Sequence, residues 1–474
     1  MAKKNELPAL IVALLVTVGI LGGGAVWLAN YLRGDGSDSR PTVDLPSRPS
    51  ASNERGLVAG ADGTSGESML PGDVSSAKQA GLDALATGDY AEAQRQFEAA
   101  LQENRNDPES VIYLNNALIE TENAYTIAVV VPAENNSNPS LEIMRGVAQA
   151  QRDINENGGI NGTPLKVLLL DDAGDIETAE EVASSLVEDT DVLGVVGHYS
   201  SDVTLAAAAV YEAGGLPVIS PTSTAVRIAT AGDYVFRTVP SDRLAAKALA
   251  NYVTNQLNKQ AAAIFYTEES TYSKSVKDEF TQEFLSSGNV VSSFDVSDRG
   301  FDAEDALQVA KEADADVLVL ALTANTKEDS LDVLAANRTE LPVVGGDDLY
   351  DFDILKDGQQ NAEGLTVAVP WHILSHTNSP FVQASSQLWG AAINWRTVTA
   401  YDAVQTLAAA IEAGGATRDD IQMALSDSGF RTEGATDDVR FFPNGDRTQP
   451  SALVTVEKTT NGPSGTGYDY IPVQ

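Results

Sequence analysis

From Tyr125 onward the chain alternates short apolar runs with stretches whose apolar residues recur at helical spacing. Nine of the runs are rich in β-branched residues and predict strands. They are YTIAVVV, PLKVLLLD, VLGVVG, LPVIS, AAAIFY, NVVSSFD, ADVLVLAL, LPVVGG and LTVAV. Such alternation is typical of repeated βα units and a mainly parallel sheet. Nine strands are too many for one ordinary open sheet, so we expect an α/β fold of two doubly wound lobes that present loops at their strand C-termini to a shared cleft.

A helical pattern without strands precedes this region, over residues 74–123. Its apolar residues recur at helical spacing, and Gly88-Asp89 breaks the first helix before a second begins near Tyr90. The segment resembles a tetratricopeptide repeat, whose positions are matched by Gly81, Gly88-Asp89-Tyr90, Ala93, Phe97, Ala100-Leu101 and Asp107-Pro108. One and a half repeats are fewer than usually fold alone. We therefore expect these helices to dock on the next domain, on another subunit or on a protein partner.

The first 33 residues predict a membrane anchor. Residues 7–32 carry no charged side chain, and at ~1.5 Å per helical residue this run can cross a bilayer core. Lys3 and Lys4 precede the run, so the positive-inside rule predicts a single-pass inner-membrane protein with its bulk in the periplasm. The alternative is a cleaved signal peptide, but the residues around Trp27 make a poor cleavage site.

Composition narrows the classes of partner. The 68 acidic and 30 basic residues give a net charge of −38, which repels the phosphates of nucleic acid, so no nucleic-acid partner is expected. The absence of cysteine excludes disulfides, thiolate metal sites and a lipid-modified cysteine, so any anchor must be peptide. Residues 34–73 are rich in Ser, Gly, Pro and Asp and predict a flexible linker between the anchor and the helices.

Several motifs between residues 125 and 455 resemble the leucine/isoleucine/valine-binding family of type I periplasmic-binding proteins. RDINENGGINGTPLKVLLLDDAGD carries the family's glycine turn followed by Asp171-Asp172, and VVGHYSSDVTLAAAAVYEAGGLPVISPTST and YVFRTVPSD follow in family order. The resemblance implies a two-lobed type I periplasmic-binding domain over residues 124–474. Lobe 1 is expected to comprise residues 124–242 and 374–441, and lobe 2 residues 243–373 and 442–474.

The resemblance also implies which residues contact the ligand. Ser201 and Thr224 hold the places of hydroxyls that bind the ligand's carboxylate, beside backbone N–H groups that suit an anion. From the second lobe, Asp347 holds the place of the acidic residue that meets the ligand's ammonium. The remaining pocket positions that the resemblance implies are those of Tyr199, Ser200, Thr222, Tyr272 and Arg396.

These residues also have purely structural interpretations. Hydroxyls at helix starts cap helices, an Asp-Asp pair suits a solvated turn, and Arg396 suits a surface ion pair in so acidic a chain. His372 and His376 are spaced for one helix face but lack a third metal ligand, so a hinge-proximal loop is the better interpretation. Without a nucleophile elbow, a phosphate loop or a metal-ligand pattern, we expect no metal, no cofactor and no catalysis.

The leading hypothesis is a membrane-tethered binding protein that captures an amino acid or amino-acid-like molecule between its lobes. Its closed form would be recognised by the permease of an ABC importer, as the family resemblance implies. The chain also resembles an outer-membrane lipoprotein activator of peptidoglycan synthase, which joins tetratricopeptide-like helices to the same fold and would make it a regulator or scaffold of the cell envelope. A sensory ligand-binding receptor is a third possibility. The retained Ser201, Thr224, Tyr272 and Asp347 favour a ligand-binding cleft.

Overall fold

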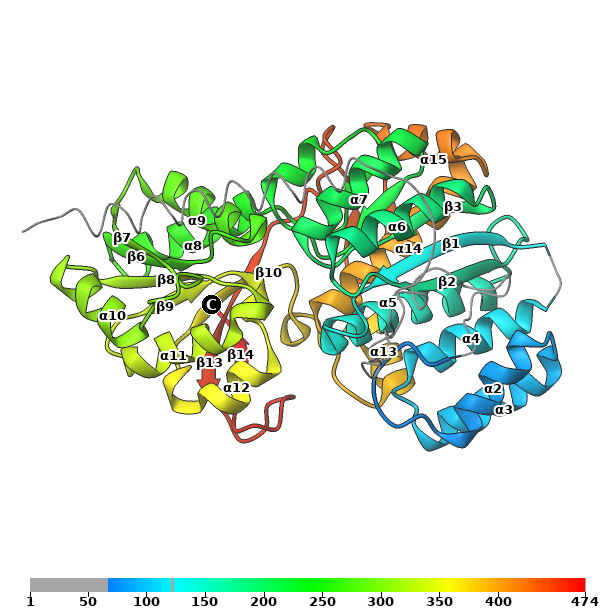
Figure 1. Ribbon diagram of the computed structural model, residues 1–474, viewed down its shortest axis with the longest axis horizontal. Coiled ribbons are helices and arrows are strands. Elements are labelled where there is room, and N and C mark those ends of the chain that lie inside the picture. The colour runs from blue at the N-terminus through cyan, green and yellow to red at the C-terminus, as the bar shows by residue number, and fades with distance from the viewer. Residues whose placement is uncertain (1–66, 121–122, 474) are drawn as a thin grey trace, which may run out of the picture. The chain divides into compact units, whose positions relative to one another are not determined.

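The computed structural model describes residues 67–120 and 123–473 of the chain (Figure 1). The predicted membrane anchor and nearly all of the predicted linker lie outside these residues, and both stay predictions. Within the part of the chain that is described, no helix combines the length and the apolar character needed to cross a membrane. Two sheets organise the region that the sequence assigns to the α/β fold.

The first sheet has five parallel strands in the order β2-β1-β3-β4-β5, and with its helices it forms lobe 1. Successive residues of a strand point to opposite faces. Ile127 and Val129 therefore share a core with α5 and α14, while Ala128 and Val130 share one with α6 and α7 (Figure 1). The elements of this lobe are β1 (Tyr125–Val131), α5 (Ser137–Glu156), β2 (Leu165–Asp171), α6 (Ile176–Glu188), β3 (Val192–Val196), α7 (Ser201–Gly214), β4 (Val218–Ser220), η1 (Val226–Thr230), β5 (Val235–Arg237), α13 (Pro380–Trp389), α14 (Trp395–Gly414), α15 (Arg418–Ser426), β11 (Thr432–Glu433) and β12 (Asp438–Val439).

The second sheet has seven strands in the order β14-β13-β10-β9-β8-β6-β7 and forms lobe 2. Ala262 and Ile264 share a core with α8 and α9, and Ala263 and Phe265 share the opposite core with α10, α11 and α12. The elements are α8 (Asp242–Asn255), β6 (Ala261–Tyr266), α9 (Thr271–Phe284), β7 (Asn289–Asp295), α10 (Ala303–Glu312), β8 (Val317–Ala321), η2 (Ala324–Thr326), α11 (Lys327–Asn337), β9 (Val343–Gly345), η3 (Asp347–Leu349), α12 (Phe352–Gly358), η4 (Gln359–Asn361), β10 (Thr366–Val369), η5 (Ile373–Ser375), β13 (Ala452–Lys458) and β14 (Tyr468–Pro472).

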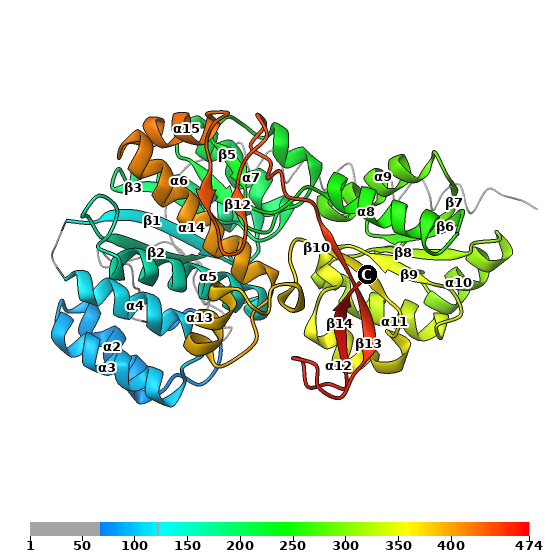
Figure 2. The ribbon, with the colours of Figure 1, turned by 180° about the vertical axis from the view of Figure 1, so that it is seen from behind.

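All nine strands expected from the sequence are present, as β1 to β4 and β6 to β10. The apolar pattern did not predict β11 and β12, which have two residues each, nor β5 and the pair β13 and β14, which runs antiparallel at the edge of the second sheet beside β10 (Figure 2). β5 has only three residues. β13 and β14 are joined by a Gly- and Ser-containing connection instead of a helix, so the βα pattern that predicts the parallel strands does not extend to them.

The glycine-rich turn before β2 forms as the sequence predicts. α5 ends at Glu156, and Gly158 and Gly159 follow with φ of 95° and 75°. A Cβ on Gly159 would lie 2.3 Å from the carbonyl oxygen of Thr163. Glycine is therefore required here both by the left-handed backbone and by the close approach of the returning chain.

Three helices make up the described part of the segment that resembles a tetratricopeptide repeat: α2 (Ser76–Ala86), α3 (Tyr90–Glu103) and α4 (Pro108–Ile119). The predicted break at Gly88-Asp89 is confirmed, with Gly88 at φ 73° and Asp89 capping α3. A Cβ on Gly81 would lie 2.8 Å from the Phe97 ring, so glycine lets α2 and α3 approach closely. The assignment to the repeat family itself stays a prediction.

These helices dock on lobe 1, which is the first of the three partners that the sequence left open. α4 contacts both α5 and the edge strand β2 (Figures 1 and 2). The buried amide of Asn116 accepts a hydrogen bond from the Val167 amide at 3.2 Å and donates one to the Val167 carbonyl at 2.8 Å. Gln151 donates a further bond to the Asn116 side-chain oxygen at 2.8 Å. Asn116 therefore occupies the backbone groups that an edge strand would otherwise expose.

The chain between residues 123 and 473 passes between the lobes three times, at residues 238–241, 370–379 and 440–451. Buried ion pairs tie the first and third connections to lobe 1. Arg237 Nε lies 2.6 Å from Asp446 Oδ1, and Arg447 pairs with Asp402 of α14 while donating to the Thr238 carbonyl. These pairs fix the direction in which the connections leave lobe 1.

Replacing Asn116 by alanine should lower the free energy of unfolding by about 1–3 kcal/mol, because both backbone groups of Val167 would lose their partner in a buried site. Urea unfolding monitored by circular dichroism measures this difference. Gln308→Ala is the control, since that amide is exposed and bonds only to Glu312 of its own helix. Equal stability of the Asn116→Ala variant and the unaltered protein would contradict the role assigned to α4.

Candidate functional site

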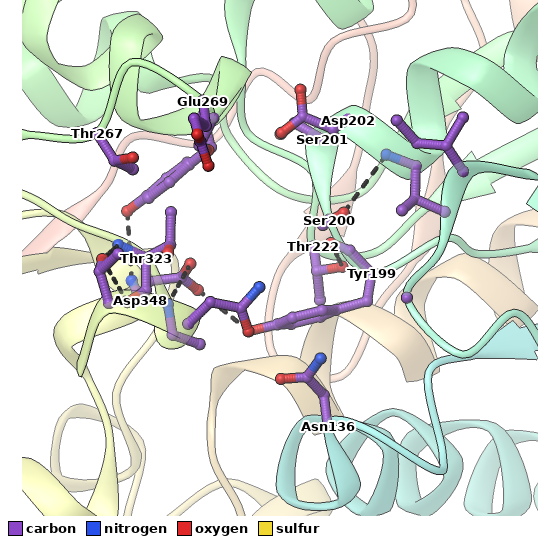
Figure 3. A pocket seen from close by; sticks show the side chains of 18 of the residues that line it. Asn136, Tyr199, Ser200, Ser201, Asp202, Thr222, Thr267, Glu269, Thr323 and Asp348 are labelled. Carbon is purple, nitrogen blue, oxygen red and sulfur yellow. Dashed lines mark hydrogen bonds between the residues drawn. The ribbon is translucent and has the colours of Figure 1, made fainter. Parts of the chain in front are cut away.

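A cavity of about 460 Å³ lies between the two lobes, at the C-terminal ends of strands from both sheets (Figure 3). Ligands of open α/β sheets bind at this edge because the loops that follow the strands converge there. Lobe 1 lines the cavity with Asn136, Gly174, Asp175, Ile176, Tyr199, Ser200, Ser201, Asp202, Val203 and Thr222. Lobe 2 lines it with Thr267, Glu269, Ser270, Tyr272, Thr323, Ala324, Asn325, Thr326, Asp347 and Asp348.

Of the eight residues that the sequence nominated, six line this cavity and two do not. The six are Tyr199, Ser200, Ser201, Thr222, Tyr272 and Asp347. Thr224 and Arg396 are buried outside the cavity wall. The motifs thus lead to loops that line the cavity, while the direction of each side chain depends on contacts that no motif encodes.

The first turn of α7 forms the lobe 1 wall. Ser200 is the N-cap, and its hydroxyl accepts from the Val203 amide at 3.4 Å, so the capping interpretation applies to this residue. Ser201 accepts from the Ala225 amide at 3.3 Å, which leaves its own hydroxyl proton available to an acceptor in the cavity. A helix N-terminus with a free hydroxyl donor is a favourable place for a carboxylate.

The two threonines after β4 differ in their surroundings. Thr222 donates to the Tyr199 carbonyl at 2.8 Å, so its hydroxyl can only accept from a ligand. Thr224 is tied to the start of α8, because its carbonyl accepts from the Asp242 amide at 2.9 Å. Its buried hydroxyl lacks a hydrogen-bond partner within the described residues and does not reach the cavity. We therefore do not place Thr224 among the groups that contact a ligand directly.

His198, which the sequence analysis did not select, holds the loop between β3 and α7. Its buried ring contacts Asp172 at 2.6 Å and the Tyr211 hydroxyl at 3.0 Å. Its carbonyl accepts from the hydroxyls of Thr204 and Ser220 at 3.2 and 3.0 Å. The second aspartate of the Asp171-Asp172 pair is therefore a structural residue that orients this ring.

On the lobe 2 side, Asp347 lies at the buried end of the cavity with only 5% of its surface exposed. Its Oδ1 accepts from the Tyr272 hydroxyl at 3.1 Å. Burial, followed by the charges of Asp348 and Asp242, raises the pKa of Asp347 well above its usual value, and Arg396 opposes this rise. A cationic ligand group beside Asp347 would stabilise the ionised carboxylate.

Asp348, in contrast, has its partners within the protein: its Oδ2 accepts from the Ala324 amide of lobe 2 at 3.3 Å, and its other partners come from lobe 1. Its Oδ1 accepts from the Tyr199 hydroxyl at 3.2 Å and from Arg396 Nη2 at 3.3 Å (Figure 3 shows the Tyr199 side chain reaching toward Asp348). Arg396 is 5% exposed and stacks over the Trp395 ring at 4.3 Å. In place of the surface ion pair that the sequence suggested, buried Arg396 pairs with partly buried Asp348 and joins the lobes at the cavity wall.

A further carboxylate, Asp242, lies at the first connection between the lobes. It is 1% exposed, and neither of its oxygens has a hydrogen-bond partner within the described residues. Burial raises the pKa of Asp242 to about 6. Arg237 and the nearby hydroxyls of Ser275 and Thr224 oppose this rise. Asp242 is the final aspartate of the YVFRTVPSD motif. The motif does not indicate that this carboxylate is buried without a partner.

The two nominated histidines lie in the second connection between the lobes. The ring of buried His372 accepts from the Leu374 amide at 3.3 Å, and burial together with His376 lowers the pKa of His372 to about 4. His376 stacks on Trp371. No group of three metal-ligating side chains is present in the described part of the chain, and these contacts suit the interpretation of a loop near the hinge.

Comparison with known proteins matches residues 124–462 to the family described as periplasmic binding protein. An amino acid binding protein of Pseudomonas aeruginosa is 33% identical over 144 residues, which cover 30% of this chain and 38% of the relative. An ABC transporter substrate-binding protein of Desulfitobacterium hafniense, solved in complex with Leu, is 26% identical with a TM-score of 0.62 and covers 73% of this chain and 100% of its own. A solute binding protein of an ABC transporter from Rhodopseudomonas palustris, solved with 3,4-dihydroxy benzoic acid, has a TM-score of 0.64 at 20% identity, over 74% of this chain and 97% of its own. This last likeness concerns the fold alone.

Replacing Asp242 by asparagine should stabilise the protein at pH 8. The pKa of Asp242 is about 6 in the folded protein and 3.8 in the unfolded chain. Ionisation of Asp242 therefore destabilises the fold progressively as pH rises through this interval, and the full loss of stability applies above it. At ~1.4 kcal/mol per pKa unit the expected gain at pH 8 is about 1–3 kcal/mol, and it should shrink toward pH 4. Denaturant unfolding at several pH values tests this, with exposed Asp298→Asn as the control. A loss of stability at pH 8 would contradict it.

Proposed function

The chain belongs to the periplasmic binding protein family, and we propose that it captures an amino acid or amino-acid-like molecule in the cavity between its lobes. The observation that carries this proposal is the position of Asp347, a buried carboxylate that lines the cavity from lobe 2 and forms no ion pair with any of the described residues. The names of relatives support the ligand class, since they include an amino acid binding protein and a substrate-binding protein in complex with Leu.

The two walls of the cavity suit the two charges of an amino acid. The ligand's carboxylate would lie at the N-terminus of α7, where Ser201 has a hydroxyl proton to donate. Its ammonium would lie beside Asp347, where the Tyr272 hydroxyl fixes one carboxylate oxygen. Asp348 is less suited to this role because Arg396 and Tyr199 already bond it. A zwitterion would thereby connect the lobes and favour the state in which they are closed.

The partner of the loaded protein would be the permease of an ABC importer. The similar structure from Desulfitobacterium hafniense is a substrate-binding protein of an ABC transporter. A permease can distinguish loaded from empty protein when ligand binding changes how the lobes meet. The scaffold alternative gains no support from the site, because the cavity keeps a polar wall on both lobes.

Asp347→Asn should weaken binding of the preferred amino acid by at least about thirty-fold. Removing one partner of a buried charge-assisted pair typically weakens the free energy of binding by ~2–5 kcal/mol. Each ~1.4 kcal/mol corresponds to a tenfold change in affinity. Ser201→Ala should cost less, about three- to tenfold, because one neutral hydrogen bond is lost and backbone donors remain. Calorimetry with the tightest-binding member of a set of the twenty common amino acids measures both effects.

The control for this experiment is Asp357→Asn, which removes an exposed carboxylate distant from the cavity wall. The deaminated analogue of the same amino acid adds a second test. Unaltered protein should lose far more affinity for the analogue than the Asp347→Asn variant does, since the variant has already lost the charge that favours the ammonium. If Asp347→Asn binds the amino acid as tightly as the unaltered protein, the amino-acid assignment fails.

The second part of the proposal is that residues 7–32 remain as a single-pass anchor in the inner membrane. The uncharged run after Lys3 and Lys4 supports it. Mass spectrometry of the mature protein should find the N-terminal residues retained in the membrane fraction, and protease should degrade the binding domain in spheroplasts. A mature N-terminus near Asn30, or protection of the domain from protease, would overturn the anchor or its orientation.

A further inference from the structure

We propose that the cavity selects a cationic amino acid and that Glu269 binds the positive group of the ligand's side chain. This inference rests on the proposed function, because it assumes that the α-carboxylate and α-ammonium lie at Ser201 and Asp347. The ligand class is then an amino acid whose side chain ends in a guanidinium or an ammonium group.

The first observation is the polarity of the cavity wall. Apart from the two tyrosines, the side chains that line it are hydroxyls, amides and carboxylates, with Ile176, Val203 and Ala324 as the aliphatic exceptions. A branched aliphatic ligand would leave many of these polar groups without partners on closure, which is unfavourable. A long side chain that carries several hydrogen-bond donors can satisfy them, because hydroxyl, amide and carboxylate oxygens all accept.

The second observation is the charge of the wall. Among the described residues, five carboxylates line the cavity and no Lys, Arg or His side chain does. The whole chain has 30 basic and 68 acidic residues. The five are Asp175, Asp202, Glu269, Asp347 and Asp348. A cavity lined by one sign of charge concentrates ligands of the opposite sign and disfavours anionic side chains.

Most of these carboxylates are already engaged. Asp202 accepts from the Thr271 amide with both oxygens at 3.1 Å, which caps α9 from the other lobe. Asp175 caps α6 by accepting from the Thr178 amide at 3.0 Å. Asp348 has Arg396 and Tyr199, and Asp347 is reserved for the α-ammonium. Glu269 differs, because none of the described residues offers it a hydrogen bond or an ion pair.

The position of Glu269 fits the end of a long side chain. Glu269 is exposed, whereas Asp347 is buried, so the two carboxylates lie at different depths of the same wall of lobe 2. Figure 3 shows Glu269 near Thr267, apart from Asp348 and Thr323. In this inference, a ligand anchored at Asp347 by its α-ammonium extends its side chain toward the solvent-facing part of the cavity, which Glu269 lines.

Calorimetry on the full-length chain in detergent tests the inference with two matched ligand pairs. L-citrulline has the length and polarity of L-arginine without the charge, and L-norleucine has the length of L-lysine without the amine. We expect L-arginine or L-lysine to bind at least about tenfold more tightly than its neutral counterpart and than L-leucine. This preference should weaken as salt rises, since an exposed carboxylate is screened.

Two neighbouring glutamates provide the matched variants. Glu269→Gln should reduce the preference for L-arginine over L-citrulline by about three- to fivefold, the size expected for a partly exposed ion pair. Glu268→Gln should leave it unchanged, because Glu268 pairs with Lys274 at 3.5 Å and does not line the cavity. A preference that survives Glu269→Gln would overturn the role of Glu269.

The remaining outcomes separate this inference from the proposed function. If L-leucine or the neutral counterparts bind as tightly as the cationic amino acids, cationic selectivity is wrong while the amino-acid function stands. If none of the twenty common amino acids binds to a protein that is folded by circular dichroism, the proposed function fails and the selectivity fails with it.

Discussion

The cavity depends on one largely buried interaction, in which partly buried Asp348 of lobe 2 bonds Arg396 and Tyr199 of lobe 1. Two charges buried together lose much of their hydration, and the loss is offset only while each keeps its partner. The pair therefore favours a specific approach of the lobes. It also occupies Asp348 and leaves Asp347, its neighbour in sequence, as the buried carboxylate that faces the cavity without a cation.

The rest of the architecture keeps the groups of this site in place. Both sheets direct the C-terminal ends of their parallel strands toward the cavity, and the first and third connections are tied by the buried pairs of Arg237 and Arg447. α4 adds rigidity farther away, since Asn116 covers the outer edge of the lobe 1 sheet. The helical segment is thus packed as a structural part of lobe 1.

The sequence predicts the fold well because parallel βα units leave a strong local signal. Each of the nine apolar runs is a strand. The antiparallel β13 and β14 were not predicted, because the pattern requires a helix between successive strands. The motifs also locate the loops of the site. They do not orient the side chains: Thr224 turns toward the start of α8 and Arg396 pairs behind the wall. No sequence motif indicates that Glu269 lines the cavity or that Asp242 is buried without a partner. Both properties depend on how segments distant in the sequence pack together.

The depth of each carboxylate determines what it can contribute to recognition. Asp347 is shielded from solvent, so its attraction for an ammonium is little affected by salt, and it can recognise the feature that all α-amino acids share. Glu269 is exposed, and its attraction for a cation is smaller and screened. In the proposed binding mode, Glu269 would discriminate among the amino acids that Asp347 and the α7 N-terminus hold. Affinity for the ligand class and selectivity within that class would then reside in different residues of one wall, so selectivity can change by substitution at the solvent-facing position without loss of the buried contacts.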